Sequence, residues 1–397
     1  MRGPLTGVRV VDLSTVLAGP FCTHQLCHLG AEVIKVETPG SGDLARQLGS
    51  DRALNEAGMG ISFLAQNAGK RSITLNLKTD DGAAAFRKLV ATADVVVENF
   101  RPGVMERLGL GYETLCEIKP ELIYCAISGF GQEGSWIKRP AYDQIIQGLS
   151  GLMTMTGDAQ SAPLRVGFPM ADTVGGLTAA FAVSSALNAR PRGSFIDVSM
   201  LASLMSMLGW AVSNFLISGN APVPQGNFNP AASPSGVFEA SDGPFNIAAN
   251  SDAMWELLTE HLGLSELRNR PEYKTRDDRK ANRRALKAEL EVVLSTRPAQ
   301  VWSEQLNALG VPSGPVLTLP GILSEPPVRE RSFVTTYDAV PGVDAPVSVA
   351  TTGVHMDGQG FSVDAPPAVL GQHTDEVLAE LGYSADEITK LRGQGVL

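Results

Sequence analysis

The fold is decided by residues 8–36, which read Val8-Arg-Val-Val-Asp-Leu13, Pro20-Phe-Cys-Thr-His-Gln-Leu-Cys-His-Leu29 and Glu32-Val-Ile-Lys-Val36 in three successive segments. The first and third are short β-branched runs typical of buried strands, and the second has the length of a helix. Gly30 follows the helical segment, at a position where glycine commonly ends a helix. This order predicts two parallel strands joined by a crossover helix.

The same alternation continues to residue 128. Further strands are expected over Ser72–Asn76, Val95–Glu98 and Leu122–Ser128, and further helices over Asp80–Ala91 and Tyr112–Lys119. Repeated strand and helix segments are typical of a parallel sheet with helices on both faces. We therefore expect an α/β sheet domain in the first half of the chain.

The character of the chain changes beyond a charge-free stretch, Val198–Phe238. Amphipathic helices are expected over Met254–Leu262, Asp277–Leu294 and Ala299–Leu309, around a strand at Phe245–Ala248. A smaller second domain fits this part of the chain.

Part of the charge-free stretch, Met200–Leu216, is nearly apolar enough to span a bilayer, but several serines and Asn214 interrupt it. A helix buried in the core of a large protein has the same composition, so we interpret the segment as a core helix and expect no membrane association.

Length and composition are those of a globular protein. With 397 residues, 44% apolar and 19% charged, the chain exceeds what one hydrophobic core usually organises, so two domains are expected. A net charge of −10 without a concentrated basic face argues against nucleic-acid binding. The four cysteines are too scattered for a disulfide framework, and the first residues lack a signal-peptide pattern. These features predict a cytoplasmic protein.

Two motifs suggest cofactor or metal chemistry, and their context argues against both. Gly129-Phe-Gly131-Gln-Glu-Gly134 matches the dinucleotide-binding pattern, but the residues after it do not open a helix, so we interpret it as a loop. His24 and His28 share a helix face, yet the residues between them do not complete a zinc-binding H-E-x-x-H motif. We therefore expect neither a nicotinamide cofactor nor a metal.

Asp172 stands apart from the other carboxylates. It follows the apolar run Val166-Gly-Phe-Pro-Met-Ala171 and precedes a charge-free helical run that begins at Thr173. One interpretation is an ordinary N-cap, whose carboxylate accepts backbone N–H groups. The other is that the helix dipole keeps a buried carboxylate ionised and available as a nucleophile. The pattern by itself leaves both open.

Segments spread over the chain carry a resemblance to one family. They are Leu17-Ala-Gly-Pro-Phe21, Leu29-Gly-Ala-Glu-Val-Ile-Lys-Val-Glu37, Lys70-Arg-Ser-Ile73, Val97-Glu-Asn-Phe-Arg-Pro-Gly103, Leu108-Gly-Leu110, Arg139-Pro-Ala-Tyr-Asp143, Met153-Thr-Met-Thr-Gly157, Gly310-Val-Pro-Ser-Gly-Pro-Val316 and Leu370-Gly-Gln-His-Thr-Asp-Glu-Val-Leu378. In these segments the sequence resembles the family III CoA-transferases, a group that includes formyl-CoA transferase, the carnitine CoA-transferase and the α-methylacyl-CoA racemases. The resemblance covers nearly the whole chain.

The resemblance implies a particular α/β architecture. It has a Rossmann-like large domain with a parallel sheet, a smaller α+β domain, and a carboxyl-terminal segment that returns to the large domain. We place these parts at 1–215, at 216–330 with a linker, and at 331–397. The resemblance also implies an interlocked homodimer of ring-shaped subunits, and no cofactor beyond coenzyme A, which is a substrate.

The resemblance further places Asp172 at the family's nucleophilic aspartate. In the implied mechanism its carboxylate attacks a donor thioester, giving a mixed anhydride and CoA thiolate, which then form an aspartyl-CoA thioester and release the donor acid. The acceptor acid takes over the CoA by the reverse steps. Exchanging one thioester for another is nearly isoenergetic, so covalent catalysis suffices without ATP or a metal.

Residues that bind CoA in the family correspond to a set of positions scattered along this chain. They are Leu17, Ala18, Leu75, Lys78, Asn99, Phe100, Arg101, Arg107 and Tyr142. Lys78 and Arg107 are expected to meet phosphates, because a cation beside a phosphate forms strong charge-assisted hydrogen bonds.

Departures from the family pattern bear on the reaction. Tyr142 stands where the racemase branch has a proton-shuttling histidine, and a tyrosine exchanges protons poorly near neutral pH. Gln225-Gly-Asn-Phe-Asn-Pro230 replaces the glycine-rich loop of formyl-CoA transferase, which argues against oxalate or formate as the substrate. Tyr124-Cys125, Ser150-Gly-Leu-Met153 and Arg165 resemble the branch that acts on succinyl-CoA and short dicarboxylates.

We therefore expect a CoA-transferase that moves CoA from succinyl-CoA or a similar donor to a short-chain carboxylic or dicarboxylic acid. A 2-methylacyl-CoA racemase and a non-catalytic acyl-CoA-binding protein are the alternatives. A dicarboxylate needs a cation for its distal carboxylate, and Arg46, Arg139 and Arg165 are the candidates.

Overall fold

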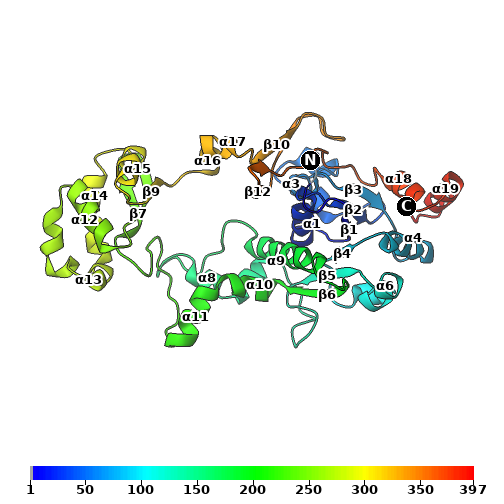
Figure 1. The fold of residues 1–397 in the computed structure, drawn as a ribbon, viewed down its shortest axis with the longest axis horizontal. Helices are drawn as coiled ribbons and strands as arrows, with labels where there is room; N and C mark the ends of the chain where they lie inside the picture. The colour runs from blue at the N-terminus through cyan, green and yellow to red at the C-terminus, as the bar shows by residue number, and fades with distance from the viewer. Residues whose placement is uncertain (1–2) are drawn as a thin grey trace. The chain divides into compact units, whose positions relative to one another are not determined.

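The computed structural model describes residues 3–397, which fold as two units (Figure 1). The first unit holds the chain up to Leu152, Arg165–Asn220 and Pro326–Leu397, and the second holds Met153–Leu164 and Ala221–Glu325. The short segment Met153–Leu164 interrupts the part of the chain that the sequence assigned to the large domain. It belongs to the second unit through contacts such as the 2.7 Å hydrogen bond from Gly226 N to Gly157 O.

A six-stranded parallel sheet forms the centre of the first unit, in the order β3-β2-β1-β4-β5-β6. Its strands are β1 (Arg9–Asp12), β2 (Glu32–Glu37), β3 (Arg71–Thr74), β4 (Val95–Glu98), β5 (Ile123–Ser128) and β6 (Ser194–Ser199). This is the strand order of the doubly wound nucleotide-binding folds. The chain adds strands towards one edge of the sheet up to β3, and from β4 on it adds them towards the other edge, so the order reverses between β1 and β4. The expected parallel α/β sheet is confirmed. Sequence analysis missed β6, because this edge strand is mostly exposed or half-buried and lacks an apolar run.

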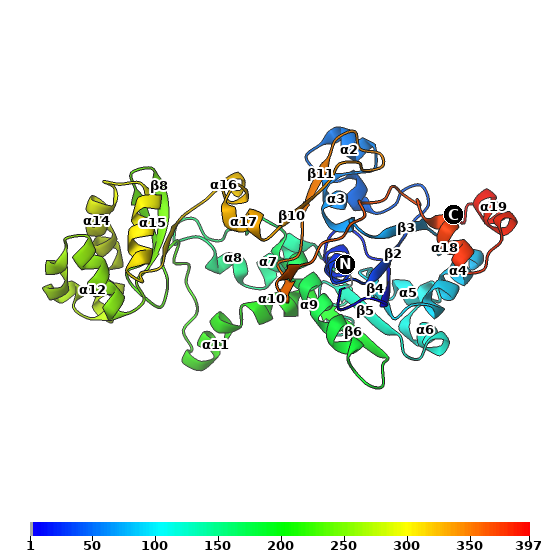
Figure 2. The ribbon, with the colours of Figure 1, turned by 45° about the horizontal axis from the view of Figure 1, so that its top comes forward.

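Helices cover both faces of this sheet (Figures 1 and 2). The core on one face includes α1 (Ala18–His28), α3 (Ile61–Asn67) and α9 (Met170–Leu187), and the core on the other includes α4 (Asp80–Ala91), α6 (Tyr112–Ile118) and α18 (Thr374–Glu380). Val10 of β1 packs into the first core, and its neighbour Val11 packs into the second. This alternation explains why the central strands are apolar at successive positions.

Shorter elements complete the first unit. They are α2 (Arg52–Glu56), α5 (Val104–Arg107), α7 (Asp143–Leu149), α10 (Met200–Met207), α11 (Gly209–Ser218), α17 (Pro326–Glu330), α19 (Ala385–Gly393) and the small strand pairs β10 (Val334–Tyr337) with β11 (Val347–Ala350) and β12 (His355–Met356) with β13 (Gln359–Gly360). The short helix α8 (Leu152–Met155) begins at the last residue of a first-unit segment, and its other residues belong to the second unit. A capping box between Ser384 and Glu387 opens α19.

The carboxyl-terminal segment closes the outer edge of β3. Ser72 N donates to His373 Nδ1 (3.1 Å), and His373 N donates back to Ser72 O (2.9 Å). Thr74 N donates to Thr374 Oγ1 (3.0 Å). The segment thereby occupies backbone groups that an open edge strand would expose.

The second unit packs helices on an antiparallel sheet. The sheet is β7 (Ser235–Ala240), β8 (Gly243–Ala248) and β9 (Ser313–Pro315), and the longer helices are α12 (Asp252–His261), α13 (Arg276–Ala281), α14 (Arg283–Leu294) and α15 (Ala299–Ala308), with α16 (Leu319–Leu323) near its end. Phe245, Trp255, Leu290 and Trp302 lie in its core. The helix expected over Asp277–Leu294 is divided at Asn282, which ends α13.

The interpretation of Met200–Leu216 as one core helix is wrong. α10 and α11 are two helices that meet at an angle of 73°, and α11 buries none of its residues in this chain. Its Trp210 is 67% exposed and its Ile217 is 86% exposed. Of the residues that the structure describes, one other helix, Met170–Asn188, is long and apolar enough to cross a membrane. It packs extensively on α1, as a core helix does.

Three ion pairs are buried beneath the carboxyl ends of β1 and β2 and beneath the loop that follows β2. The Nζ–O distances are 3.0 Å for Lys70 to Asp12 and 2.9 Å for Lys35 to Asp43, and Arg46 meets Glu37 through two bonds of 2.7 Å. All six side chains are almost completely inaccessible to solvent. We call these residues the buried ionic network. Burial opposes the ionisation of Asp12, but Lys70 and Lys35 hold the pKa of its carboxyl group below its usual range.

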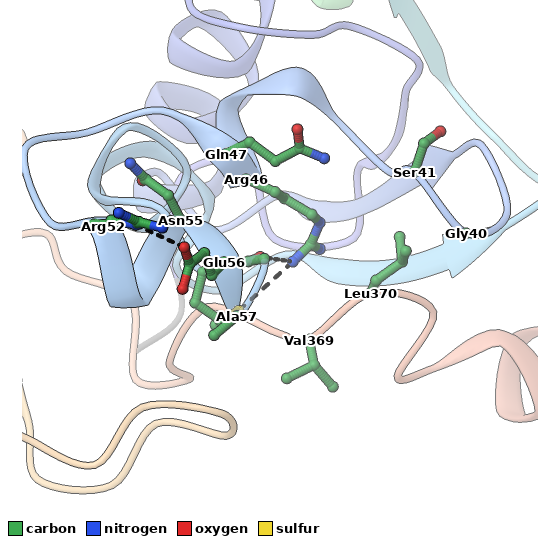
Figure 3. Close-up of a pocket in the computed structure, with 12 residues that line it drawn as sticks. Gly40, Ser41, Arg46, Gln47, Arg52, Asn55, Glu56, Ala57, Val369 and Leu370 are labelled. Carbon is green, nitrogen blue, oxygen red and sulfur yellow. Dashed lines mark hydrogen bonds and ion pairs between the residues drawn. The ribbon is translucent and has the colours of Figure 1, made fainter.

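Arg46 belongs to this network and is fully engaged in it. Besides Glu37, its guanidinium donates to the carbonyl oxygens of Gly58 (3.2 Å) and Ala368 (3.3 Å). Its side chain is one of those that line a separate hollow of about 530 Å³, together with Asn55 and Val369 (Figure 3). Arg46 is therefore excluded as the cation for a substrate carboxylate.

Glu37→Gln should destabilise the protein by about 3–5 kcal/mol, because it leaves the Arg46 charge buried without a counter-charge. Glu380→Gln is the matched control. It removes the partner of Arg71 in a partly exposed ion pair and should cost less than about 1 kcal/mol. Urea denaturation of both variants measures the difference, and equal losses would contradict a structural role of the buried ionic network.

Candidate active site

The candidate site lies where the strand order of the sheet reverses. The loops after β1 and β4, residues 15–18 and 99–101, line a hollow of about 400 Å³ together with the loop before α7 and the first turn of α9. We call it the central hollow. In open parallel sheets, ligands bind at this reversal, beyond the carboxyl ends of the strands.

Two further hollows adjoin the central one within the first unit. One of about 470 Å³ lies towards β3 and shares Thr15, Gly42 and Phe100 with it. The other, of about 570 Å³, shares Arg101 and Arg139 and is also lined by Arg107 and Lys138. We call these the β3-side hollow and the basic hollow. The basic hollow gathers four cationic residues and one acid, Glu106, in a chain whose net charge is −10.

The structure brings Asp172 and all the residues expected to bind CoA to these three hollows, whereas Arg46 and Arg165 do not line any of them. The central hollow is lined by Leu17, Ala18, Asn99, Phe100, Arg101, Tyr142 and Asp172, the β3-side hollow by Leu75, Lys78 and Phe100, and the basic hollow by Arg101 and Arg107. Residues from distant stretches of the chain thus meet along the carboxyl edge of one sheet. Sequence reasoning did not select Val16, Asp43 or Met200.

The loop after β1 is held from two sides. Asn99 forms a pair of 2.8 Å bonds with Thr15, accepting from its backbone N–H and donating to its carbonyl oxygen. Val16 has a left-handed backbone with φ of 65°, which is rare for a β-branched residue. Its N–H donates to Asp43 Oδ1 (2.9 Å), which ties this strained turn to the buried ionic network.

The carboxyl group of Asp172 is not a helix cap. Pro169 occupies the N-cap position of α9, and Asp172 lies in the first turn. Asp143 takes the capping role instead, because its Oδ1 accepts from Ala171 N (2.8 Å) and, more weakly, from Asp172 N (3.4 Å). Among residues 3–397, no hydrogen bond or ion pair engages the Asp172 carboxylate. The N-cap interpretation is therefore wrong.

Burial raises the pKa of Asp172 to about 7, and the negative charge of Asp143 adds to the shift. Asp143 itself is held by Gln147 Nε2 (2.8 Å) and by an ion pair with Arg165 (3.1 Å). The interpretation in which the helix dipole keeps this carboxylate ionised did not include desolvation, which raises the pKa towards neutrality. A carboxylate with a raised pKa is more basic, and once ionised it is a stronger nucleophile.

Glu98 is a second perturbed acid beside the site. It is buried at the end of β4, and its Oε2 accepts from Phe100 N (2.7 Å). Burial raises the pKa of Glu98 to about 8, so its side chain is mostly protonated near neutral pH. The motif Val97–Gly103 contains it, but a sequence pattern does not reveal its burial.

Neither of the motifs that suggested a nicotinamide cofactor or a metal has the structural context that its pattern requires. Gly129–Gly134 lies in the loop after β5, and the next helix begins only at Asp143. His24 and His28 are buried with ring centroids 4.3 Å apart, and burial holds the pKa of His28 at about 4. The described residues contain no group of three or more His, Cys, Asp or Glu side chains that could hold a metal ion.

A doubly wound parallel sheet with a perturbed carboxylate at its reversal point and a basic hollow beside it defines an α/β protein whose site is suited to an anionic ligand. Residues 5–374 match the sequence model of CoA-transferase family III. The chain belongs to this family, and it is a CoA-transferase.

Named relatives and a solved structure match most of the chain. It is 41% identical to an acetyl-CoA:oxalate CoA-transferase of Acetobacter aceti, over 88% of this chain and 90% of that protein. It is 36% identical to a succinate–glutarate CoA-transferase of Agrobacterium fabrum, over 96% of both. A crystal structure of a CaiB/BaiF family protein from Brucella suis superposes with a TM-score of 0.84 at 36% identity, covering 96% of this chain and all of that one.

The raised pKa of Asp172 makes stability depend on pH. The folded chain retains a proton that the unfolded chain releases above its usual pKa of 3.8, so the stabilisation is complete below that pH and is lost as pH rises through about 7. Asp172→Asn removes this loss. It should be more stable than the parent at pH 8 by about 1–3 kcal/mol, with a much smaller difference at pH 4.5.

Urea denaturation at the two pH values measures the effect. The matched control is Asp344→Asn, a change at an exposed carboxylate that should give no such pH-dependent gain. A stability difference for Asp172→Asn that is the same at pH 4.5 and pH 8 would refute the burial argument.

Proposed function

We propose that this CoA-transferase works through a covalent intermediate on Asp172. One observation carries the proposal: a half-buried carboxylate with a pKa of about 7 and no partner among residues 3–397 opens onto the central hollow. A carboxylate held by a cap or an ion pair would have to break those bonds before attack. Asp172 does not, because Asp143 satisfies the backbone N–H groups at the start of α9.

In the first half-reaction, an Asp172 carboxylate oxygen attacks the thioester carbonyl of the donor, and the C–S bond breaks. The products are a mixed anhydride and CoA thiolate. The thiolate attacks the Asp172 carbonyl carbon and expels the donor as a free carboxylate, which leaves an aspartyl-CoA thioester. The acceptor carboxylate attacks this thioester, which gives a second mixed anhydride and CoA thiolate. The thiolate then attacks the acyl carbon of the acceptor, forms the new thioester and expels the Asp172 carboxylate. No step requires a net proton transfer, so a carboxylate alone suffices.

The three hollows accommodate the parts of the CoA molecule in this proposal. Leu17, Ala18 and Asn99 line the central hollow beside Asp172, where the thioester end would lie. Arg101 and Arg107 in the basic hollow and Lys78 in the β3-side hollow are available to the phosphates, because none of these cations forms an ion pair within the described chain.

We further propose a dicarboxylic acid as the acceptor, with Arg165 as the cation for its distal carboxylate. Arg165 is 43% exposed, and one of its guanidinium nitrogens pairs with Asp143 at the first turn of α9. Arg139 stacks over Trp136 (4.1 Å) at the border of the basic hollow, on the side assigned to the phosphates. The two named relatives act on oxalate and on succinate and glutarate, which are all dicarboxylates.

A homodimer, interlocked as in the expected architecture, also belongs to the proposal. Apolar side chains stand exposed along α9 and α11, among them Leu177, Phe181, Trp210 and Ile217. Exposed apolar side chains gathered on neighbouring helices are typical of a protein interface, and a second copy of the chain is the proposed occupant. The proposed location is the cytoplasm, in keeping with four free cysteines in the described chain.

Racemisation is less well supported than transfer. It requires an acid and a base on opposite sides of the substrate α-carbon. The central hollow contains no histidine among the described residues, and Tyr142 at its rim is 71% exposed.

Asp172→Asn should lower the rate of CoA transfer by at least about 10³-fold, because the amide is a far weaker nucleophile. Succinyl-CoA or acetyl-CoA is incubated with oxalate, glutarate, mesaconate or acetate, and new thioesters are identified by mass spectrometry. Brief incubation of the parent enzyme with donor should leave a CoA adduct on the peptide that contains Asp172. Asp344→Asn serves as the control and should transfer at the parent rate.

The possible results separate the alternatives. Transfer by Asp172→Asn at the parent rate would exclude the covalent mechanism. Exchange of only the α-proton with deuterated solvent would establish a racemase, and binding of acyl-CoA without any conversion would establish a non-catalytic binding protein.

Arg165→Gln should raise KM for glutarate relative to acetate by about 10–100-fold, the usual effect of losing one charge-assisted hydrogen bond. Any indirect effect through Asp143 acts on both acids equally and cancels in the ratio. Arg139→Gln is the matched variant and should leave the ratio unchanged. If Arg139→Gln alters the ratio and Arg165→Gln does not, the assignment to Arg165 is wrong.

A further inference from the structure

Two adjacent glycines, Gly175 and Gly176, lie inside α9, one turn beyond Asp172. Glycine within a helix costs about 0.5–1 kcal/mol relative to alanine, so its presence there calls for a packing reason. Both glycines are buried, and each lies against a different wall of the central hollow.

Gly176 permits a close approach of two backbones. A Cβ atom at this position would lie 2.3 Å from the carbonyl oxygen of Ala18 and 3.1 Å from the Phe21 ring. A backbone carbonyl at the start of α1 cannot rotate away as a side chain can. At Gly175, by contrast, a Cβ would meet Met200 Cγ at 3.0 Å, and that flexible side chain can move.

The close contact between α9 and α1 at Gly176 affects the position of Asp172. Residues four apart lie on the same face of a helix, so Gly176 is directly below Asp172 on α9. Gly176 contacts Ala18, and Leu17 and Ala18 line the central hollow together with Asp172. The spacing of α1 and α9 at Gly176 therefore sets the distance between the carboxylate and this part of the hollow.

The loop that leads into α1 is braced against yielding. Val16 is fixed in its left-handed conformation by its bond to Asp43, and Thr15 is fixed by Asn99. Asp43 is in turn paired with buried Lys35. If α9 moved away from Ala18, the loop could not follow without breaking these bonds.

We propose that Gly176 is a positioning residue for CoA transfer, and that its missing side chain fixes how closely Asp172 approaches a thioester beside Leu17 and Ala18. The inference rests on the proposed role of Asp172 as nucleophile. A methyl group at position 176 needs about 1 Å more room to reach an ordinary contact of 3.4 Å. A misplacement of this size in a reacting group can reduce the rate by about 10²-fold.

Gly176→Ala and Gly175→Ala form a matched pair, because both add one methyl group to neighbouring positions of the same helix. Gly176→Ala should lower kcat for CoA transfer by about 10²-fold, while KM for the acyl-CoA changes less than about threefold because the β3-side and basic hollows are unaltered. Gly175→Ala should keep kcat within about threefold of the parent. Single-turnover formation of the Asp172 adduct, followed by mass spectrometry, locates the defect at the attack on the thioester.

Val16→Gly is the second variant, and it decides the question if Gly176→Ala does not fold. It relaxes the loop on the opposite side of the contact without adding an atom to the core. The expected result is a kcat about tenfold lower with a Tm no lower than that of the parent, because the left-handed strain is relieved. A purely structural role would lower Tm and kcat together.

The inference fails if Gly176→Ala keeps kcat within threefold of the parent, or if Gly175→Ala loses as much activity as Gly176→Ala. It also fails if Val16→Gly, tested in place of an unfolded Gly176→Ala, retains full kcat. These outcomes are distinct from failure of the proposed function, in which Asp172→Asn itself transfers CoA at the parent rate.

Discussion

Six charged side chains with no access to water lie beneath the loops that form the site, and they must neutralise one another for the protein to fold. Lys70 pairs with Asp12, Lys35 with Asp43, and Arg46 with Glu37. A buried charge without its partner costs several kcal/mol, so each pair restricts where its two segments can lie. These contacts join β1, β2, the loop after β2 and the segment before β3. The network therefore fixes the loop after β1, on which the central hollow depends.

This arrangement changes the meaning of the sequence motifs that carry the family resemblance. Lys35, Glu37 and Lys70 belong to those motifs, yet their side chains are buried and paired with protein groups. Their contribution to a ligand site is indirect, through Asp43, which joins Lys35 to the strained turn at Val16. A residue typical of an enzyme family can thus serve the framework of the site without contacting the substrate.

Two carboxylates with different roles, Asp143 and Asp172, meet at the first turn of α9. Asp143 satisfies the backbone N–H groups of the helix and is itself held by Arg165 and Gln147. Asp172 is left without a partner among the described residues, in an environment that raises its pKa to about 7. Ionising such a group lowers the free energy of unfolding. The buried ionic network beneath the site helps the protein to stay folded despite this loss. One turn further along α9, Gly176 has no side chain, and this allows the helix to lie close to α1.

The sequence by itself determined the α/β class, five of the six strands and the main helices, because apolar periodicity and turn residues are local properties. Through its motifs it also determined the family and the set of residues that meet at the three hollows. The order of the strands, the cap formed by Asp143, the engagement of Arg46 and the exposure of α11 were decided only by the tertiary structure. Each depends on which residues from distant parts of the chain come together. The direction of the pKa shift of Asp172 belongs to the same group, since desolvation depends on everything that surrounds a carboxylate and the helix dipole is only one part of that environment.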